Sequence, residues 1–257
     1  MRDEIALVAE FCKTNLDLEN VRTADEYGYS SLPLCVIDSV FSIGVNYAST
    51  RNTVDRFCEY FQVSKTSAIT PPDISEQLSI SKFLQINSEQ GIEGMARNVY
   101  QNLQRTSTRN GILKAEAVVR FSEVLMQSTV NYLQDVEKIL GNQKFESAIT
   151  KIPGQRSGLS LRYFYMLAGA ENYVKPDRMV MRFLQSALDR YPSIDESQKI
   201  IVGACEILSK RYPELNPRAL DHQIWLYQRE KGNDRQGVGY RLTAVSRGKP
   251  QEDQKGQ

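Results

Sequence analysis

Apolar side chains recur at helical spacing along almost the whole chain, and this periodicity constrains the fold more than any other feature. Residues on one face of an α-helix fall at positions i, i+3, i+4 and i+7. The clearest case consists of Leu34, Ile37, Val40, Phe41 and Val45. This stretch is apolar on nearly every side, so it predicts a helix at the centre of a bundle. Since strands and helices do not alternate along the chain, the sequence predicts an all-α fold.

The same periodicity predicts further helices between glycine and proline interruptions. They are expected around residues 5–12, 54–61, 78–84, 95–103, 115–125, 133–140, 145–152, 159–168, 180–188, 200–208 and 220–227. From residue 231 onward Gly, Gln, Arg and Lys dominate, which predicts a flexible basic tail over 231–257, interrupted at most by a strand over 238–244.

The length of 257 residues predicts two lobes, because single cores tend to split beyond about 250 residues. We expect a helical, barrel-like lobe over residues 30–150. The second lobe would combine residues 1–29 with residues 151–230.

Composition limits the class of partner. Lys and Arg number 32 against 31 acids, giving a formal net charge of +1, so any nucleic-acid face must be a local patch. No segment approaches the roughly 20 apolar residues that span a bilayer, and the Met1-Arg2-Asp3-Glu4 start lacks the positive charge of a secretory signal. We therefore expect no membrane association and a cytoplasmic protein.

The four cysteines lie within apolar helical patterns and lack C-x-x-C spacing. They are Cys12, Cys35, Cys58 and Cys205. This arrangement predicts buried free thiols rather than disulfides or a metal site.

The stretch KIPGQRSG, residues 151–158, forms a tight corner between two predicted helices. A helix start exposes unpaired amides with a partial positive charge, and glycine lets a ligand approach the backbone. With Arg156 adding a full charge, the corner is suited to hold a phosphate. The alternative is an ordinary helix-turn-helix corner without any ligand.

Asp177 follows Pro176 and precedes an apolar-striped helix in the stretch VKPDRMVMRFL. Aspartate at this position is a favoured N-cap. A carboxylate held by helix amides also stays ionised near neutrality, and it can stabilise a developing cation or orient a water molecule.

The corner and the aspartate together resemble the helix-hairpin-helix (HhH-GPD) DNA glycosylases of the endonuclease III and MutY type. The hairpin opens with Ile152-Pro153-Gly154, and Asp177 follows 25 residues after Ile152. ILKAEAVVRF and FESAITKIPG are similar to family helices, and LPLCVIDSVFSIGVNYASTRNTVDRF is similar to the segment that lines the base pocket. The resemblance covers about residues 32–188.

The resemblance implies a two-lobed glycosylase-like fold with a hairpin at 151–168 and a monofunctional DNA N-glycosylase that flips a modified or mispaired base. Asp177 would stabilise the sugar cation and activate water. DNA would be bound by Gly154, Gln155, Arg156, Ser157 and Gly158, and Asn46 and Tyr47 would line the base pocket or fill the gap.

Departures from the family qualify this expectation. Gly158 stands where bifunctional members carry the Schiff-base lysine, and neither Lys151 nor Lys175 matches that position, so no lyase step is expected. The four-cysteine iron-sulfur loop is absent, with only Cys205 in the C-terminal region. We expect no cofactor and no side-chain metal site, although hairpin carbonyls could hold a monovalent cation.

The expected partner is double-stranded DNA and the expected state is a monomer, associated with the nucleoid in a bacterium or placed in the nucleus otherwise. A non-catalytic hairpin DNA-binding protein, with Asp177 only a helix cap, is the main alternative. A helical module that binds another protein is a third. Arg178 and Arg182 could face phosphate together, and His222 is expected to be structural.

Overall fold

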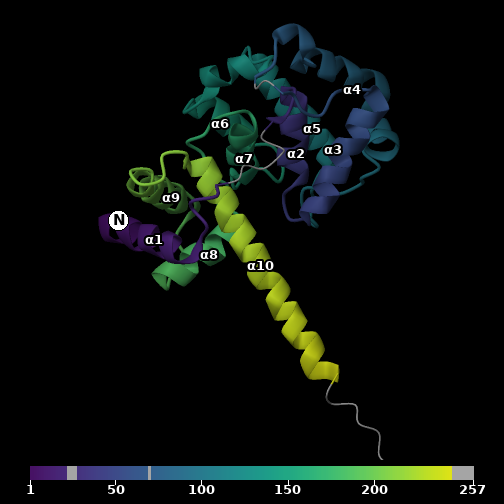
Figure 1. The fold of residues 1–257 in the computed structure, drawn as a ribbon. Coiled ribbons are helices and arrows are strands. Elements are labelled where there is room, and N and C mark those ends of the chain that lie inside the picture. Colours follow the sequence, from purple (N-terminus) through teal and green to yellow (C-terminus); the bar gives the residue numbers. More distant parts are fainter. Residues whose placement is uncertain (22–27, 69–70, 245–257) are drawn as a thin grey trace, which may run out of the picture.

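The computed structural model describes the backbone of residues 1–21, 28–68 and 71–244, and the side chains within those ranges as far as residue 231. The described chain is all-α, as expected (Figure 1). Its helices are α1 (Arg2–Asn15), α2 (Leu32–Phe41), α3 (Tyr47–Phe61), α4 (Ile80–Gly94), α5 (Lys114–Gln127), α6 (Gln143–Thr150), α7 (Leu159–Leu167), α8 (Arg178–Leu188), α9 (Ile194–Leu208) and α10 (Pro217–Ala244). Shorter turns are 3₁₀-helical at Ile74–Glu76 and Leu133–Ile139 and π-helical at Met95–Val99.

Polar side chains fix the starts of several helices. Asn46 accepts a hydrogen bond from the amide of Ala48 at the start of α3. Ser193 and Glu196 form a reciprocal capping box at the start of α9. These side chains satisfy amides that have no partner within the helix, so they set the residue at which each helix begins.

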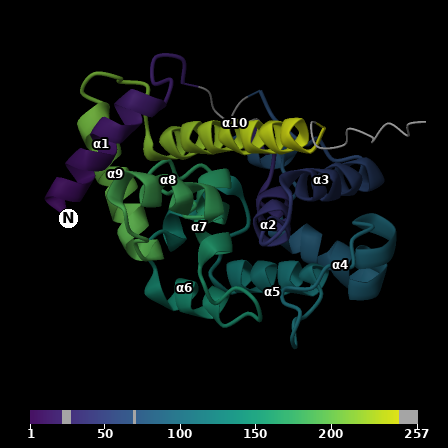
Figure 2. The ribbon, with the colours of Figure 1, turned by 90° about the horizontal axis from the view of Figure 1, so that it is seen from below.

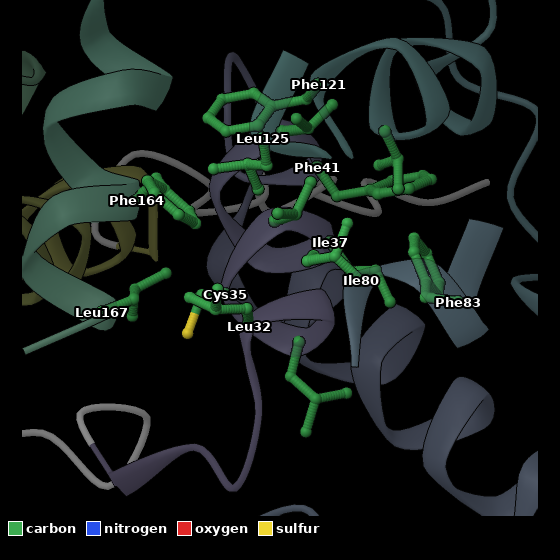
Figure 3. Close-up of a cluster of buried hydrophobic side chains, with 14 of the residues drawn as sticks. Leu32, Cys35, Ile37, Phe41, Ile80, Phe83, Phe121, Leu125, Phe164 and Leu167 are labelled. Carbon is green, nitrogen blue, oxygen red and sulfur yellow. The ribbon is translucent and has the colours of Figure 1, made fainter. Parts of the chain in front are cut away.

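A first hydrophobic core surrounds α2 (Figure 3). Every residue of α2 is buried, which confirms the expectation of a central helix. Phe83 of α4, Phe121 of α5 and Phe164 of α7 pack around it as part of the same cluster. Because α2 is surrounded by these helices, its C-terminal end has a fixed position, and the turn that follows forms part of the site described below.

A second hydrophobic core joins the first helix to the last three. Val8 and Cys12 of α1 lie in one cluster with Phe183 of α8, Ile201 of α9 and Ile224 of α10. Figures 1 and 2 show α1, α8 and α9 grouped beside the start of α10. The molecule therefore has two helical lobes, and the second is built from both ends of the chain.

The two cores divide later in the sequence than expected. The first core runs from Tyr29 to Leu167, and the second resumes at Val174. The helix that leaves the hairpin, α7, therefore packs in the first lobe and not in the second. Its apolar face packs against α2, and the sequence pattern does not indicate in which lobe this helix packs.

Two other expectations differ from the structure. The backbone of residues 231–244 continues α10, where a flexible tail or a strand over 238–244 was expected, and residues 245–257 lie outside the described residues. The helix expected over 95–103 ends at Val99, and a connection without regular structure follows.

All four cysteines are buried free thiols, which confirms the prediction for Cys12, Cys35, Cys58 and Cys205. Burial raises their pKa values, to about 12 for Cys12 and to about 11 for Cys58 and Cys205. In the described ranges, none of the helices is long and apolar enough to cross a membrane.

Candidate functional site

A cavity of about 610 Å³ lies where the two lobes meet. Its walls come from the turn after α2, the start of α3, α7, the segment 175–182 and α10. The first lobe supplies Ser42, Tyr47 and Tyr163, and the second lobe supplies Asp177 and Asp221. The position of the cavity therefore depends on both cores.

Asp177 stands at the N-terminus of α8 and is half-buried at the cavity wall. Its Oδ1 accepts hydrogen bonds from the amides of Met179 at 2.7 Å and Val180 at 3.3 Å. The side chain is thus an N-cap, as expected, and it also lines the cavity. The cap fixes the direction of the carboxylate, because both amides hold the same oxygen.

Lys175 lies two residues before Asp177 and lines the same cavity. Its Nζ donates a 3.0 Å hydrogen bond to Ser42 Oγ and lies 3.6 Å from the centroid of the Tyr163 ring. This ammonium group bridges the two lobes, since Ser42 and Tyr163 belong to the first and Lys175 to the second. It places a positive charge at the cavity lining.

Asp221 of α10 is a second carboxyl group in the cavity and is only 8% exposed. Its Oδ2 accepts a 2.9 Å hydrogen bond from the backbone amide of Lys175. Burial, reinforced by the nearby charge of Asp177, raises the pKa of Asp221 to about 8. The cavity thus contains two carboxyl groups in different surroundings.

Lys114 supports the turn that forms the first-lobe wall. The buried Nζ donates 2.8 Å hydrogen bonds to the carbonyl oxygens of Phe41 and Ile43, which flank Ser42. Desolvation, with a smaller contribution from the charge of Lys175, lowers the pKa of Lys114 to about 8. The end of α2 is thereby held by a side chain from α5.

A group of aromatic rings also lines the cavity. Tyr47 meets Trp225 edge to face with ring centroids 6.4 Å apart, and His222 stacks on Trp225 at 5.9 Å. The guanidinium group of Arg229 lies 5.2 Å from the Trp225 ring. These rings offer flat surfaces on which a nucleobase could stack.

Four exposed arginines line the cavity: Arg51, Arg178, Arg182 and Arg229. None of them makes an ion pair with an acid of the described residues. With Lys175 they give the cavity a local positive charge in a chain of net charge +1, and such a patch suits an anionic ligand.

The family comparison covers almost all of the structure just described. A family model described as "Domain of unknown function (DUF8548)" matches residues 6–229. The chain belongs to this family. The matched range of the DUF8548 domain includes every residue that lines the cavity, from Ser42 to Arg229. No curated protein and no solved structure matches the chain.

Three residues expected from the sequence meet at this cavity of the DUF8548 domain. Asn46 and Tyr47, at the start of α3, line it together with Asp177. Arg178 and Arg182 also line it, so their i, i+4 spacing does place them on one face. His222, expected to be structural, stacks on Trp225 at the cavity wall.

The hairpin residues do not line the cavity. Gln155 is 2% exposed, and its side chain accepts a hydrogen bond from Ser160, so it holds the first turn of α7 and does not face solvent. Gly154, Arg156 and Ser157 are exposed and Gly158 is half-buried. Contact between these four residues and DNA stays a prediction.

Glycine is required at position 154 for a structural reason that is independent of any ligand. Its φ is +85°, and a Cβ at this position would overlap the side chain of Thr106. Thr106 belongs to the connection between Tyr100 and α5. The glycine therefore allows the hairpin to pack against this connection, whether or not it also contacts a phosphate.

Asp221, Trp225 and Arg229 were not expected at the site. They follow one another at intervals of four residues, which places them on one face of α10. The same spacing joins Tyr47 to Arg51. Polar and aromatic residues that repeat at i+4 on the predicted helices indicate these two faces. The same pattern does not indicate that the faces of α3 and α10 meet at one cavity.

Proposed function

We propose that this DUF8548 chain has a helix-hairpin-helix glycosylase-like fold and acts as a DNA N-glycosylase. The observation that carries the proposal is the meeting of Asp177 with Asn46 and Tyr47 in one cavity between two helical lobes. These residues lie in two segments that are far apart in the sequence, and both segments resemble the glycosylase family. Their convergence supports a common site for a flipped nucleotide.

The cavity suits the chemistry of base removal. A base rotated out of the duplex would stack against the aromatic wall that Tyr47 and Trp225 form, and this contact would offset the stacking energy that the base loses on leaving the duplex. Arg178 and Arg182 would bind the flanking phosphates. The sugar would then lie near Asp177.

Asp177 would stabilise the positive charge that forms on the sugar as the N-glycosidic bond breaks, and would orient the attacking water. Its capping bonds preorganise the carboxylate for this role, since Oδ1 is held by two amides. The hairpin would hold the backbone of the same strand through Arg156 and the exposed backbone around Gly154 and Ser157.

The test is base release from a panel of DNA duplexes. Each carries a single uracil, 5-hydroxymethyluracil, 8-oxoguanine, N7-methylguanine or mismatch, and alkali-labile sites are counted after incubation with the full chain. We expect release from at least one duplex, and a loss of roughly 10²-fold or more in Asp177→Asn. Asparagine can still cap α8, so the variant removes the charge and keeps the fold.

Asp73→Asn is the matched control. Asp73 also caps a helical turn, with Oδ1 accepting from the amide of Ser75 at 2.9 Å, but it does not line the cavity. Its substitution should leave base release unchanged. Salt-sensitive DNA binding without any base release would instead favour a non-catalytic hairpin protein, and absence of DNA binding at low salt would contradict both functions.

A further inference from the structure

The second carboxyl group of the cavity, Asp221, has no counterpart in the mechanism above. It comes from α10, whereas Asp177 caps α8, and both side chains line the same space. A site that breaks a C–N bond needs a group that stabilises the sugar cation, and it also needs one that stabilises the departing base. Asp177 can serve the first need only.

The two carboxyl groups have different surroundings, as expected if one stabilises the sugar cation and the other protonates the departing base. Asp177 is half-exposed, and its Oδ1 accepts hydrogen bonds from two backbone amides. Asp221 is almost fully buried, and its Oδ2 accepts from one amide only. Pairs of carboxyl groups placed in such contrasting environments commonly divide into an acid and a base or ion stabiliser.

We infer that Asp221 is the general acid of this site, donating a proton to the departing base from the oxygen that the Lys175 amide does not hold. The inference rests on the proposed glycosylase function and adds a second catalytic residue to it. Because Oδ2 is fixed by the amide, the other oxygen is the one available to turn toward the cavity. The raised pKa of Asp221, about 8, keeps the carboxyl protonated at neutral pH.

The charged groups that face Asp221 come from more than its own helix. Asp177 raises its pKa, and Lys175 acts in the opposite direction through its charge and its amide. The arginines of α3, α8 and α10 line the same cavity, further toward solvent. A phosphate bound by these arginines would offset their positive charge, and its negative charge would favour the protonated form of Asp221.

The step balances as a hydrolysis. The electron pair of the bond between C1′ and the base nitrogen moves onto the base, which takes the proton from Asp221. Water adds to C1′ and gives its proton to Asp177. Asp177 then releases that proton to solvent, and Asp221 regains one from solvent, so the products are the free base and an abasic sugar.

Asp221 also ties α10 to the segment before Asp177, and a test must separate this positioning role from acid catalysis. Asp221→Asn does so, because the asparagine Oδ1 can accept the same hydrogen bond from the Lys175 amide but cannot supply an acidic proton. A purely structural role would therefore be largely preserved in this variant.

The experiment measures single-turnover base release from the panel duplexes between pH 6 and about 10. Uracil, 5-hydroxymethyluracil and 8-oxoguanine are neutral and need a proton to leave well. N7-methylguanine is already cationic and leaves without one. We expect Asp221→Asn to lose roughly 10²-fold or more on the neutral bases and to stay close to wild type on N7-methylguanine.

The pH profile gives an independent readout. Wild-type release of a neutral base should fall as the pH rises through about 8, and this descending limb should be missing in Asp221→Asn. If the variant does not fold, as judged by thermal melting, the wild-type profile alone decides, and a profile without this limb overturns the inference.

Other outcomes are equally decisive. Neutral bases released by Asp221→Asn at the wild-type rate would overturn the acid role while leaving the glycosylase function in place. Release of N7-methylguanine alone would also overturn it, because that base needs no proton. No release from any duplex by the wild type would overturn both proposals.

Discussion

The carboxylate Oδ2 of Asp221 accepts a 2.9 Å hydrogen bond from the backbone amide of Lys175, and so α10 is joined to the chain two residues before Asp177. Both residues of this pair line the cavity between the lobes. The link has consequences for stability as well as for chemistry, because it places a buried carboxyl group next to another one.

The free energy of unfolding should depend on the ionisation of Asp221. Its pKa is about 8 in the folded protein and near 3.8 in an unfolded chain, so the folded state binds more protons between these values. Stability contributed by the protonated carboxyl is therefore lost as the pH rises from about 4, and the loss is complete above about 8. Asp221→Asn does not ionise, so it should gain stability relative to wild type across this window in thermal melts at pH 5 and pH 8.

Asp73→Asn should show the opposite sign. Hydrogen bonds from Ser75 lower the pKa of the exposed Asp73, so its contribution to stability is present above its usual value and is lost in acid. The variant should be slightly less stable than wild type at neutral pH and equal to it in acid. A pH-independent difference for both variants would contradict the assignment of the two carboxyl groups.

Gly154→Ala should destabilise the hairpin. Its φ of +85° is unfavourable for alanine, and the added Cβ would overlap Thr106, so we expect a loss larger than the roughly 1–2 kcal/mol of left-handed backbone strain alone. Gly141→Ala is the control, because Gly141 has a φ of +69° but open space around its Cβ. Urea unfolding midpoints would measure both, and equal losses would show that the Thr106 contact carries no cost.

The cysteine thiols should be unreactive in the folded protein. Burial raises the pKa of Cys12 to about 12 and that of Cys205 to about 11, and the thiolate is the reactive form. A disulfide reagent such as DTNB should modify the native chain slowly at neutral pH and react with all four cysteines after denaturation. Fast modification of native thiols would mean that the cores open readily.

The arginines of the cavity should contribute to DNA affinity through phosphate contact. Arg182→Ala should weaken binding to a labelled duplex regardless of sequence, and reduce the slope of log K against log salt by roughly one. Arg97→Ala is the control, because Arg97 is exposed but paired with Glu93 at 3.0 Å and does not line the cavity. Equal slopes for wild type and Arg182→Ala would exclude a phosphate at this position.

The hairpin arginine can be tested in the same assay. Arg156 is exposed but lies outside the cavity lining, so Arg156→Ala tests whether the hairpin itself contacts the backbone. A reduced salt slope would support the hairpin as a second contact point. An unchanged slope would restrict the DNA contact to the cavity.

The sequence predicted where helices form and which of their faces are buried, because the spacing of apolar residues shows which face of a helix is apolar. The fully buried α2 is the clearest example, and Asp177 as the cap of α8 is another. Both features are local, and each depends on residues within one or two turns of the chain.

The features that the sequence did not predict depend on which helix faces pack together in the folded chain. In the sequence, Asp221 looks like an ordinary polar residue of α10. In the structure, the packing of α10 against α8 places it in the same cavity as Asp177. Gln155 in the hairpin is polar but buried, because Ser160 satisfies its side chain. Long-range packing of this kind leaves no periodic signal in a single sequence.

The second core unites α1 with α8, α9 and α10, while the first core is complete within residues 29–167. As the chain leaves the ribosome, the first core can close as soon as α7 has emerged, but the packing partners of α1 are made only after that. Asp177 and Asp221 can therefore come together only after α10 has been made, so a nascent chain that stops after α7 would carry the cavity residues Tyr47 and Tyr163 without either acid.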